Sequence, residues 1–323
     1  MSPDAGVPPR DAWSDYWESG STGEAMPDDH PGTRALTRFW DQRAEELAGR
    51  TGGRLVDLAC GGGFVTQRLM AALAGGGADW QLLALDVAEP AVRQLCTASG
   101  GALQGVVGDA ARLPIAAGSM DAVVSQFGLE YAGRDALLDV AALLAPDGQL
   151  MLLSHHAEGT IAQGCRDNAR VLAAMRDSGL LKGMLGLFTL LDAPGTGGRR
   201  DLNRINAALR RATQATATLV RTGPSCAAMP WVRRLCQDVS QVYERAGFHD
   251  PAAVLHWLRR IDDQLNSYHG RMQGMVSAAL SAKQMASVTR AWQQQGLSVR
   301  EAGALKVDAR PLAWQLLAVR SAA

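Results

Sequence analysis

Short apolar runs alternate with amphipathic segments through the first half of the chain. Apolar runs bounded by turn residues are typical of buried strands, and apolar residues spaced by three and four are typical of helices. We therefore expect strands at 54–59, 82–86, 103–107, 121–126 and 149–154. Between them, helical segments are expected at 63–74, 88–97 and 133–144. Strands that alternate with helices predict a mostly parallel sheet with right-handed crossovers.

The pattern changes after residue 157, where the strand signal disappears until the end of the chain. Helical spacing is present in the segments 159–178, 201–221, 229–247, 251–268 and 271–295. Two further strand candidates, 297–303 and 313–320, close the chain, and one more helix is expected at 33–47, before the first strand. The pattern therefore predicts an α/β core that resumes after a long helical insertion.

Length limits the number of domains. A chain of 323 residues is long enough for about two domains, each with its own core. We expect an N-terminal arm and helix at 1–48, an α/β core formed by 49–156 and 296–323, and the helical insertion at 157–295.

Charge and cysteine usage argue against several classes of protein. Lysine and arginine number 32, and aspartate and glutamate also number 32, so no global basic field attracts nucleic acid. An uninterrupted apolar run of about 18 residues is absent, which argues against a transmembrane helix. The N-terminus lacks the basic and apolar regions of a signal peptide. Five cysteines without a C-x-x-C pair favour reduced thiols and a cytoplasmic location. We thus expect neither a nucleic-acid partner nor a membrane partner.

One glycine-rich turn carries most of the chemical information. A short apolar strand ends at Asp57 and is followed by Gly61 and Gly63. Glycines allow the backbone to approach a small ligand closely. A phosphate-binding P-loop needs a lysine after its last glycine, and this turn has none. A dinucleotide-binding turn needs a third glycine, where this chain has Thr66 or Phe64.

The remaining pattern, Asp-x-x-x-Gly-x-Gly at 57–63, resembles the first motif of the class I S-adenosylmethionine-dependent methyltransferases of the small-molecule type. Ala59 stands where that family most often has glycine. The stretch 121–131 resembles the family's fourth motif, and 313–319 resembles its final strand. The resemblance implies a Rossmann-like, seven-stranded, mostly parallel sheet with an antiparallel last strand. The helical insertion would then lie between strands five and six.

The same resemblance implies S-adenosylmethionine as cofactor, bound at the carboxyl ends of the strands. Asp57 is expected near its ammonium group, Asp86 at the ribose hydroxyls and Asp109 at the adenine amine. The predicted cofactor-binding residues are Asp57, Ala59, Gly61, Gly63, Asp86, Val87, Asp109, Ala110, Gln126, Phe127 and Tyr16. Alternatively, Asp86 and Asp109 cap the helical turns that follow them, and Asp57 only satisfies backbone amides in the glycine turn.

Methyl transfer depends mainly on alignment and on exclusion of water, so it needs no strong catalytic motif. A general base helps an oxygen or nitrogen acceptor to lose its proton. His155 and His156 follow the fifth strand and are the catalytic candidates; the alternative is a hydrogen-bonded histidine at a strand exit. Trp13, Tyr16 and Trp17 are expected either to close the cofactor pocket or to pack on the sheet. The spacing of the histidines predicts no metal site.

We therefore expect methyl transfer to a small-molecule acceptor, with O-methylation favoured over N- or C-methylation by frequency. The helical insertion is expected to act as a substrate lid, as a dimerisation element of a homodimer, or as both. Two alternatives stay open: a methyltransferase acting on RNA or protein, and a non-catalytic methyltransferase-like scaffold that binds partners through the helical block. Neutral net charge counts against the first, and the retained glycines and aspartates count against the second.

Overall fold

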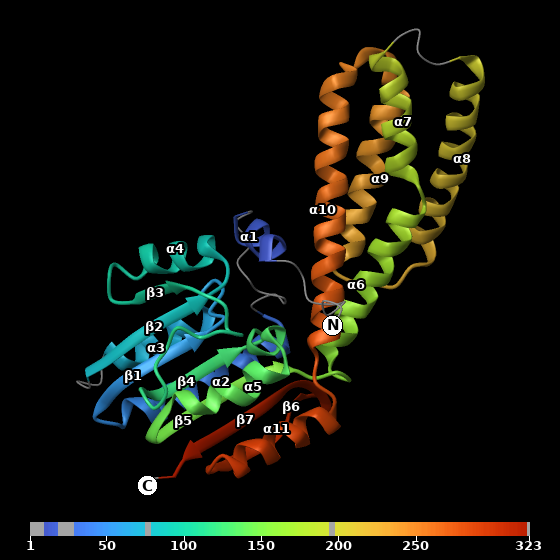
Figure 1. The fold of residues 1–323 in the computed structure, drawn as a ribbon. Coiled ribbons are helices and arrows are strands. Elements are labelled where there is room, and N and C mark those ends of the chain that lie inside the picture. Colours follow the sequence, from blue (N-terminus) through green and yellow to red (C-terminus); the bar gives the residue numbers. More distant parts are fainter. Residues whose placement is uncertain (1–9, 19–28, 75–78, 194–197, 322–323) are drawn as a thin grey trace. The chain divides into compact units, whose positions relative to one another are not determined.

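The computed structural model describes residues 10–18, 29–74, 79–193 and 198–321. The chain divides into two compact units (Figure 1). The first, which we call the α/β unit, comprises 1–163 and 274–323, and the second, the helical unit, comprises 164–273. Predictions that concern residues 1–9 and 19–28 of the N-terminal arm lie outside the described residues.

The α/β unit is built on one seven-stranded sheet. Its strands are β1 (Gly52–Leu58), β2 (Asp79–Asp86), β3 (Gln104–Val107), β4 (Met120–Gln126), β5 (Leu144–His155), β6 (Leu297–Val307) and β7 (Arg310–Arg320). Their order across the sheet is β3-β2-β1-β4-β5-β7-β6. Strands β1 to β5 are parallel to their neighbours in this set, and β7 is antiparallel to both β5 and β6. This confirms the predicted fold class, an α/β protein with a mostly parallel sheet and an antiparallel last strand.

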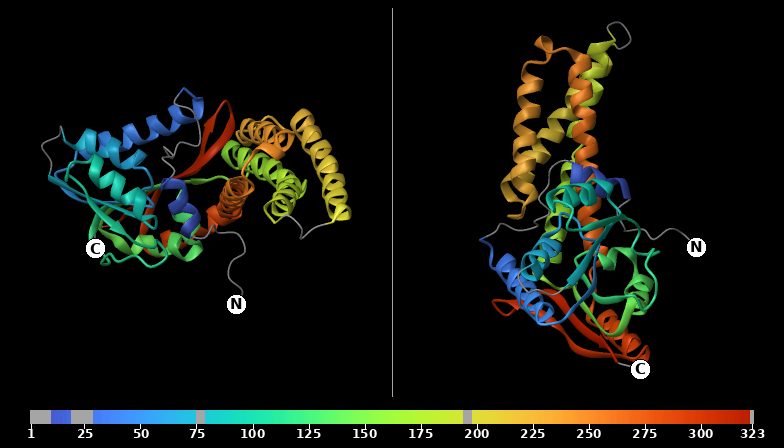
Figure 2. Two further views of the ribbon diagram at one scale, coloured as in Figure 1. Left: turned by 90° about the horizontal axis from the view of Figure 1, so that it is seen from above. Right: turned by 90° about the vertical axis from the view of Figure 1, so that its left-hand side faces the viewer.

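Helices cover both faces of this sheet (Figure 2). They are α2 (Pro31–Ala48), α3 (Phe64–Ala74), α4 (Glu89–Ala98), α5 (Arg134–Asp139) and α11 (Ala282–Gln294), with the 3-10 turns η1 (Leu129–Ala132) and η2 (Val140–Leu143). Apolar side chains of α5, η2 and α11 share one buried core with the strands. Trp292 on α11 is fully buried there and donates its indole N–H to the carbonyl of Leu137 at 2.8 Å. Because a buried indole needs such a partner, this bond fixes α11 on the sheet.

Two boundaries in the α/β unit differ from the predicted ones. β5 begins at Leu144, before the predicted start at 149. Asp147 has φ of 59°, and the register with β4 shifts there, so residues 145–148 form a bulge within the strand. The helix expected at 133–144 is the short α5 continued by η2, because its last turn tightens into 3-10 geometry.

The helical unit contains long helices packed around an apolar core of its own. The helices that build it are α6 (Thr160–Asp177), α7 (Leu180–Asp192), α8 (Arg199–Thr222), α9 (Ala228–Glu244) and α10 (Pro251–Ala278), with the 3-10 turn η3 (Ala246–Phe248). Met184, Phe188, Val232 and Leu258 are fully buried in its core. Within the described residues, none of the helices has the length and apolarity that a membrane span requires.

Helix α7 is absent from the sequence-based expectation. Its sequence contains Gly183 and Gly186, which interrupt a helical pattern, and its apolar residues are too continuous to show a period. The structure supplies the reason for one glycine. A Cβ at Gly183 would lie 2.6 Å from the side chain of Leu209, so glycine there allows α7 and α8 to approach closely.

Helix α10 is continuous where a break was expected at 268–271. Gly270 lies inside it, and the chain instead breaks at 279–281. Ser281 then caps α11 by accepting from the backbone N–H of Gln284. Since α11 packs on the sheet, residues 274–295 of the predicted insertion do not belong to the helical unit.

Candidate functional site

Four parallel strands end at one edge of the sheet. β1 ends at Leu58, β2 at Asp86, β4 at Gln126 and β5 at His155. Their registers place these ends side by side. In open α/β sheets ligands bind at this edge, near the point where the strand order reverses. The predicted residues of the first, second, fourth and fifth strand ends are therefore brought together.

The glycine turn after β1 requires small residues for steric and conformational reasons. Gly61 has φ of 49° and Gly63 has φ of 82°, in the left-handed region that favours glycine. A Cβ at Gly61 would lie 2.6 Å from the indole of Trp17, and one at Gly63 would lie 2.3 Å from Leu95. The turn is closed by a bond of 2.9 Å from the N–H of Gly63 to the carbonyl of Cys60.

Ala59 shares this left-handed conformation, with φ of 55°. An L-residue in that region is strained by roughly 1–2 kcal/mol, which explains why glycine is usual at this position. The methyl group of Ala59 is accommodated because residue 128 is glycine: a Cβ at Gly128 would lie 2.2 Å from that methyl group. Ala59 is therefore tolerated in the turn together with Gly128.

Asp86 connects the glycine turn to the following helix. Its Oδ2 accepts from the N–H of Gly61 at 2.8 Å, and its Oδ1 accepts from the N–H of Ala88 at 2.9 Å. Burial raises the pKa of this carboxyl, and its hydrogen bonds with backbone N–H groups oppose the rise. Ala88 is the N-cap residue of α4, and α4 has no side-chain cap, so Asp86 fixes the residue before the helix and does not cap the helix itself. Each carboxylate oxygen has two acceptor sites, so the predicted contact with a ribose remains compatible with these two bonds.

Asp57 is buried beneath the glycine turn, where Thr66 donates its hydroxyl to Oδ2 at 2.5 Å. Burial, assisted by the nearby charge of Asp86, raises the pKa of Asp57 from its ordinary value of 3.8 to about 7, against the lowering effect of Thr66. A cation placed close to this carboxyl would favour its ionised form. Its predicted contact with an ammonium group stays a prediction.

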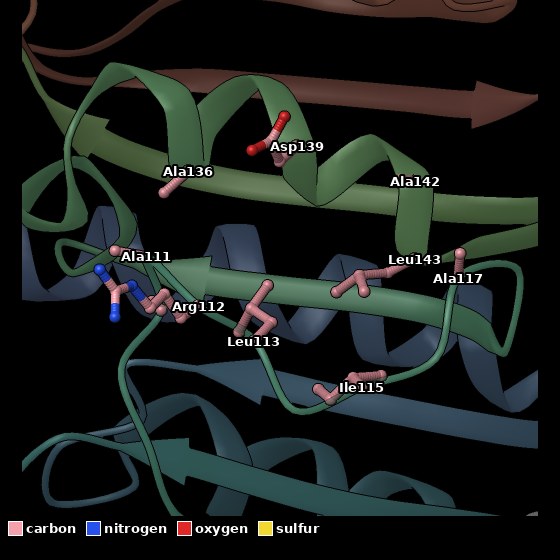
Figure 3. Close-up of a pocket in the computed structure, with 10 residues that line it drawn as sticks. Ala111, Arg112, Leu113, Ile115, Ala117, Ala136, Asp139, Ala142 and Leu143 are labelled. Carbon is pink, nitrogen blue, oxygen red and sulfur yellow. The ribbon is translucent and has the colours of Figure 1, made fainter.

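Asp109 is exposed and accepts from the N–H of Ala111 at 2.8 Å, so it stabilises its own turn. Ala110 lies beside it and lines a cavity of about 390 Å³ between the 110–117 loop and α5 (Figure 3). Arg112 and Asp139 are the charged residues of that cavity, and the rest of its lining is apolar. Neither Asp57 nor Asp86 lines this cavity.

Gln126 and Phe127 follow β4. The Oε1 of Gln126 accepts from the indole N–H of Trp40 at 2.7 Å, which ties this strand end to α2. Phe127 has φ of 54°, and its ring centroid lies 4.4 Å from that of His155. Val87 is half-buried and lies between Asp86 and Ala88 in the chain.

An N-terminal helix, α1 (Arg10–Glu18), lies beside the glycine turn and α4. Trp17 is buried against Ala88 and Ala91, and its carbonyl accepts from the side chain of Gln94 at 3.2 Å. The ring of Tyr16 lies 5.1 Å from that of Trp17. Trp13 completes this aromatic group and contacts Tyr131 beyond β4, with ring centroids 5.4 Å apart. The aromatic arm therefore reaches the strand-end site.

His155 and Glu130 form a buried pair at the end of β5. Nδ1 of His155 lies 2.7 Å from Oε1 of Glu130, which also accepts from the backbone N–H of His155 at 2.8 Å. Only 1% of His155 and 5% of Glu130 is exposed. A carboxylate oxygen accepts, so the imidazole proton is assigned to Nδ1 and the lone pair to Nε2. The ring is held between Phe127 and Tyr131.

His156 has a different environment. Its Nδ1 accepts from the backbone N–H of Glu158 at 3.0 Å, and its ring stacks on Trp314 with centroids 4.1 Å apart. Burial lowers the pKa of this imidazole. These contacts assign its proton to Nε2 and hold the ring in place. The two histidines are therefore not equivalent as candidate bases.

The described residues contain no group of histidine, cysteine, aspartate and glutamate side chains arranged to hold a metal ion. None of the five cysteines, all of which lie within the described residues, forms a disulfide.

Comparison with known protein families identifies the kind of domain that contains this edge of the sheet. Residues 56–152 match the family model described as a methyltransferase domain. They form a class I S-adenosylmethionine-dependent methyltransferase domain. The match begins in β1 and ends within β5, so it covers the ends of β1, β2 and β4 and the turns that follow them, and it stops before His155. No curated protein matches the chain.

Several solved structures are similar to parts of the chain. A proposed methyltransferase, solved in complex with the Haloferax volcanii Trm112 methyltransferase activator, has 21% identity over 45% of this chain and 60% of that chain, with a TM-score of 0.34. A methyltransferase from Mesorhizobium loti has 22% identity over 36% of this chain and 52% of that chain, with a TM-score of 0.31. A methyltransferase from Methanococcus maripaludis has 12% identity over 100% of this chain and 98% of that chain, with a TM-score of 0.42. This chain thus spans 60% and 52% of the length of the first two.

S-adenosylmethionine is the cofactor of the methyltransferase domain. The residues present fit it, because Gly61 and Gly63 form a turn without side chains at the strand-end edge and two buried carboxyls, Asp57 and Asp86, lie beside that turn. Both carboxyls suit a ligand that carries an ammonium group, a sulfonium group and a ribose diol. When bound, the cofactor supplies an activated methyl group. The individual contacts of the predicted residues with it stay predictions.

Sequence reasoning missed three partnerships in the methyltransferase domain. The position of Glu130 before the helix expected at 133–144 is typical of a helix cap, whereas the structure shows that Glu130 binds His155. Thr66 appeared only as a failed glycine, whereas it donates to Asp57. Gly128 had no assigned role. A possible signal was the isolated acid at 130 directly before an aromatic residue, but nothing local identifies its partner.

Proposed function

We propose that the methyltransferase domain transfers a methyl group from S-adenosylmethionine to a small-molecule acceptor, with oxygen favoured over nitrogen or carbon as the acceptor atom. The observation that carries this proposal is the buried Glu130–His155 pair at the carboxyl end of β5. A base with a defined tautomer is useful when the acceptor must lose a proton, as a hydroxyl group does. A thioether or an unprotonated amine would need no such base.

In this proposal His155 accepts the acceptor's proton on Nε2. Glu130 holds Nδ1–H, fixes the orientation of the ring and stabilises the imidazolium that forms. Burial keeps water away from both groups, which strengthens their electrostatic interaction. General-base catalysis of this kind contributes about 10²–10⁴-fold to rate. The stacked and hydrogen-bonded ring of His156 supports a positioning role for that residue instead.

The wider setting also belongs to the proposal. Five cysteines without a disulfide support a reducing, cytoplasmic location. The helical insertion is proposed as a substrate lid, as the contact surface of a homodimer, or as both. Tyr16 and its neighbouring tryptophans on α1 are proposed to close the cofactor site, in line with their contact with the glycine turn and α4.

Cofactor binding is the first test. Calorimetric titration with S-adenosylmethionine is expected to show one site per chain. Asp86→Ala should weaken binding about 100-fold, because it removes a charged acceptor and frees the N–H groups of Gly61 and Ala88. Asp79→Ala is the matched control, since Asp79 begins the same strand and is exposed at the opposite edge. Failure of the intact protein to bind the cofactor would refute the proposal.

The general base is tested with an acceptor that the protein methylates. His155→Gln should lower kcat about 10²–10⁴-fold with little change in cofactor affinity. Glu130→Gln should lower kcat and alter its pH profile, because an amide stabilises the imidazolium less well. His156→Gln is the matched control and should retain most of the activity. Equal losses in both histidine variants would exclude the specific role of His155.

A macromolecular acceptor is the second candidate, and one observation favours it. Of the 32 basic and 32 acidic residues of the chain, 16 basic and nine acidic residues lie in the helical unit. Its formal charge is therefore positive although the whole chain is neutral. Such asymmetry is typical of proteins that bind anionic partners. Transfer of labelled methyl groups to total RNA, but not to a small-molecule extract, would favour this candidate.

A further inference from the structure

The helical unit contains a cavity of about 760 Å³ between α7, α8 and α9. Ligand-binding cavities in proteins typically measure about 300–1,000 Å³. Every lining residue belongs to the helical unit, so the cavity exists independently of the methyltransferase site.

The inner wall of the cavity is mostly apolar. Leu180, Met184, Leu209 and Val239 line it and are buried. Thr216 adds one buried hydroxyl, which donates to the carbonyl of Thr213 at 3.1 Å. An apolar wall of this kind favours a hydrocarbon group, because water gains little by hydrogen bonding there.

The opening of the cavity is cationic. Arg210 on α8 and Arg233 on α9 both line it and are exposed. Neither of them forms an ion pair within the described part of the helical unit, where four other arginines do. Glu244 is the one carboxylate among the lining residues. Since arginine side chains bind phosphate and carboxylate with paired N–H groups, the opening suits an anionic head group.

We propose that this cavity binds a single-chain amphiphile, with its hydrocarbon chain against the apolar wall and its anionic head between Arg210 and Arg233. Charge complementarity and the apolar interior together select this class. A nucleic acid would use the exposed arginines but has no group for the apolar wall. Inorganic phosphate would leave that wall unused. The proposal does not rest on methyl transfer, and a binding measurement tests it without any reaction.

Decyl phosphate below its micelle concentration is a suitable probe, titrated calorimetrically into the full chain. We expect saturable binding at one site per chain. Arg210→Gln and Arg233→Gln should each weaken it about 10-fold, the lower end of what a charge-assisted hydrogen bond contributes. Ala217→Phe should abolish it, because Ala217 lines the cavity and is exposed at its opening. Arg211→Gln and Ala215→Phe are the matched controls, since both are exposed on α8 and neither lines the cavity.

Several results would overturn the proposal. One is absence of saturable binding to a chain whose circular dichroism is that of the folded protein. Another is a loss in the control variants as large as in the cavity variants. Full competition by inorganic phosphate would indicate a simple anion site, and tighter binding of a short RNA, weakened equally by Arg211→Gln, would indicate a nucleic-acid surface. Sedimentation that shows a dimer dissociated by Ala217→Phe would indicate that a second copy covers the cavity.

Discussion

Asp57 links the stability of the methyltransferase domain to pH. Its carboxyl is buried and has a pKa of about 7 in the folded protein, against an ordinary value of 3.8. At a pH between these two pKa values, the folded chain binds one more proton at Asp57 than the unfolded chain does. The contribution of Asp57 to stability is therefore complete below about pH 4 and is lost as the pH rises through 7. The whole difference amounts to ~4 kcal/mol, at 1.36 kcal/mol per pKa unit.

Asp57→Asn removes this dependence while it preserves the shape of the side chain. The hydroxyl of Thr66 can rotate to accept from an amide, so the local hydrogen bond survives. Urea denaturation of both proteins at pH 5, 6, 7 and 8 measures the effect. We expect the free energy of unfolding of the wild type, relative to the variant, to fall by about 3 kcal/mol from pH 5 to pH 8.

Asp79→Asn is the control for this measurement, because its carboxylate is exposed at the start of β2. A relative stability of wild type and Asp57→Asn that stays constant within about 0.5 kcal/mol from pH 5 to pH 8 would refute the reasoning. Protonation of Asp57 also bears on the affinity for the cofactor. If its ammonium group contacts Asp57, affinity should be about tenfold weaker at pH 6 than at pH 8, and Asp57→Asn should abolish that difference.

Three further predictions concern packing. Gly128→Ala should destabilise the protein by about 1–3 kcal/mol through overlap with Ala59, and Ala59→Gly in the same chain should restore most of that loss in a double-mutant cycle. Trp40→Phe should cost about 1–2 kcal/mol in thermal denaturation, because the Oε1 of Gln126 loses its donor. Phe188→Ala should destabilise the helical unit by about 3–5 kcal/mol in chemical denaturation, because the removed ring leaves an empty space in that unit's own core. Cofactor affinity should stay unchanged.

The sheet was predictable because its signals are local. An apolar run that ends in an acid and a glycine turn identifies β1, and apolar runs that end at Asp86 and at Gln126 identify β2 and β4. The boundaries that shifted depend on single residues in unusual conformations. Asp147 at positive φ keeps β5 intact through a turn sequence, and Gly270 stays helical because the bundle around α10 supports it. Local propensity does not include either effect.

The Glu130–His155 pair was not predictable from local signals, because the two residues are separated by 25 positions. Their contact depends on the parallel register of β4 with β5, which places Gln126 opposite Leu153 and so aligns the segments that follow. The positive charge of the helical unit was likewise not predictable, because it depends on where the structure divides the chain. Net charge over the whole chain is zero, and only the division at 164 and 273 reveals the excess of arginine.

Asp86 was expected either to cap the next helix or to bind the cofactor, and the structure shows that its carboxylate accepts from the N-cap residue Ala88 and from Gly61 without capping α4. By accepting from Gly61 and Ala88, the carboxylate fixes the glycine turn and the start of α4 before any ligand arrives. A site held in this way binds its ligand with less loss of conformational entropy. In the proposed cofactor site, these two bonds therefore preorganise the turn. The loss of affinity in Asp86→Ala should accordingly exceed that expected from one ribose contact alone, because the turn becomes disordered as well.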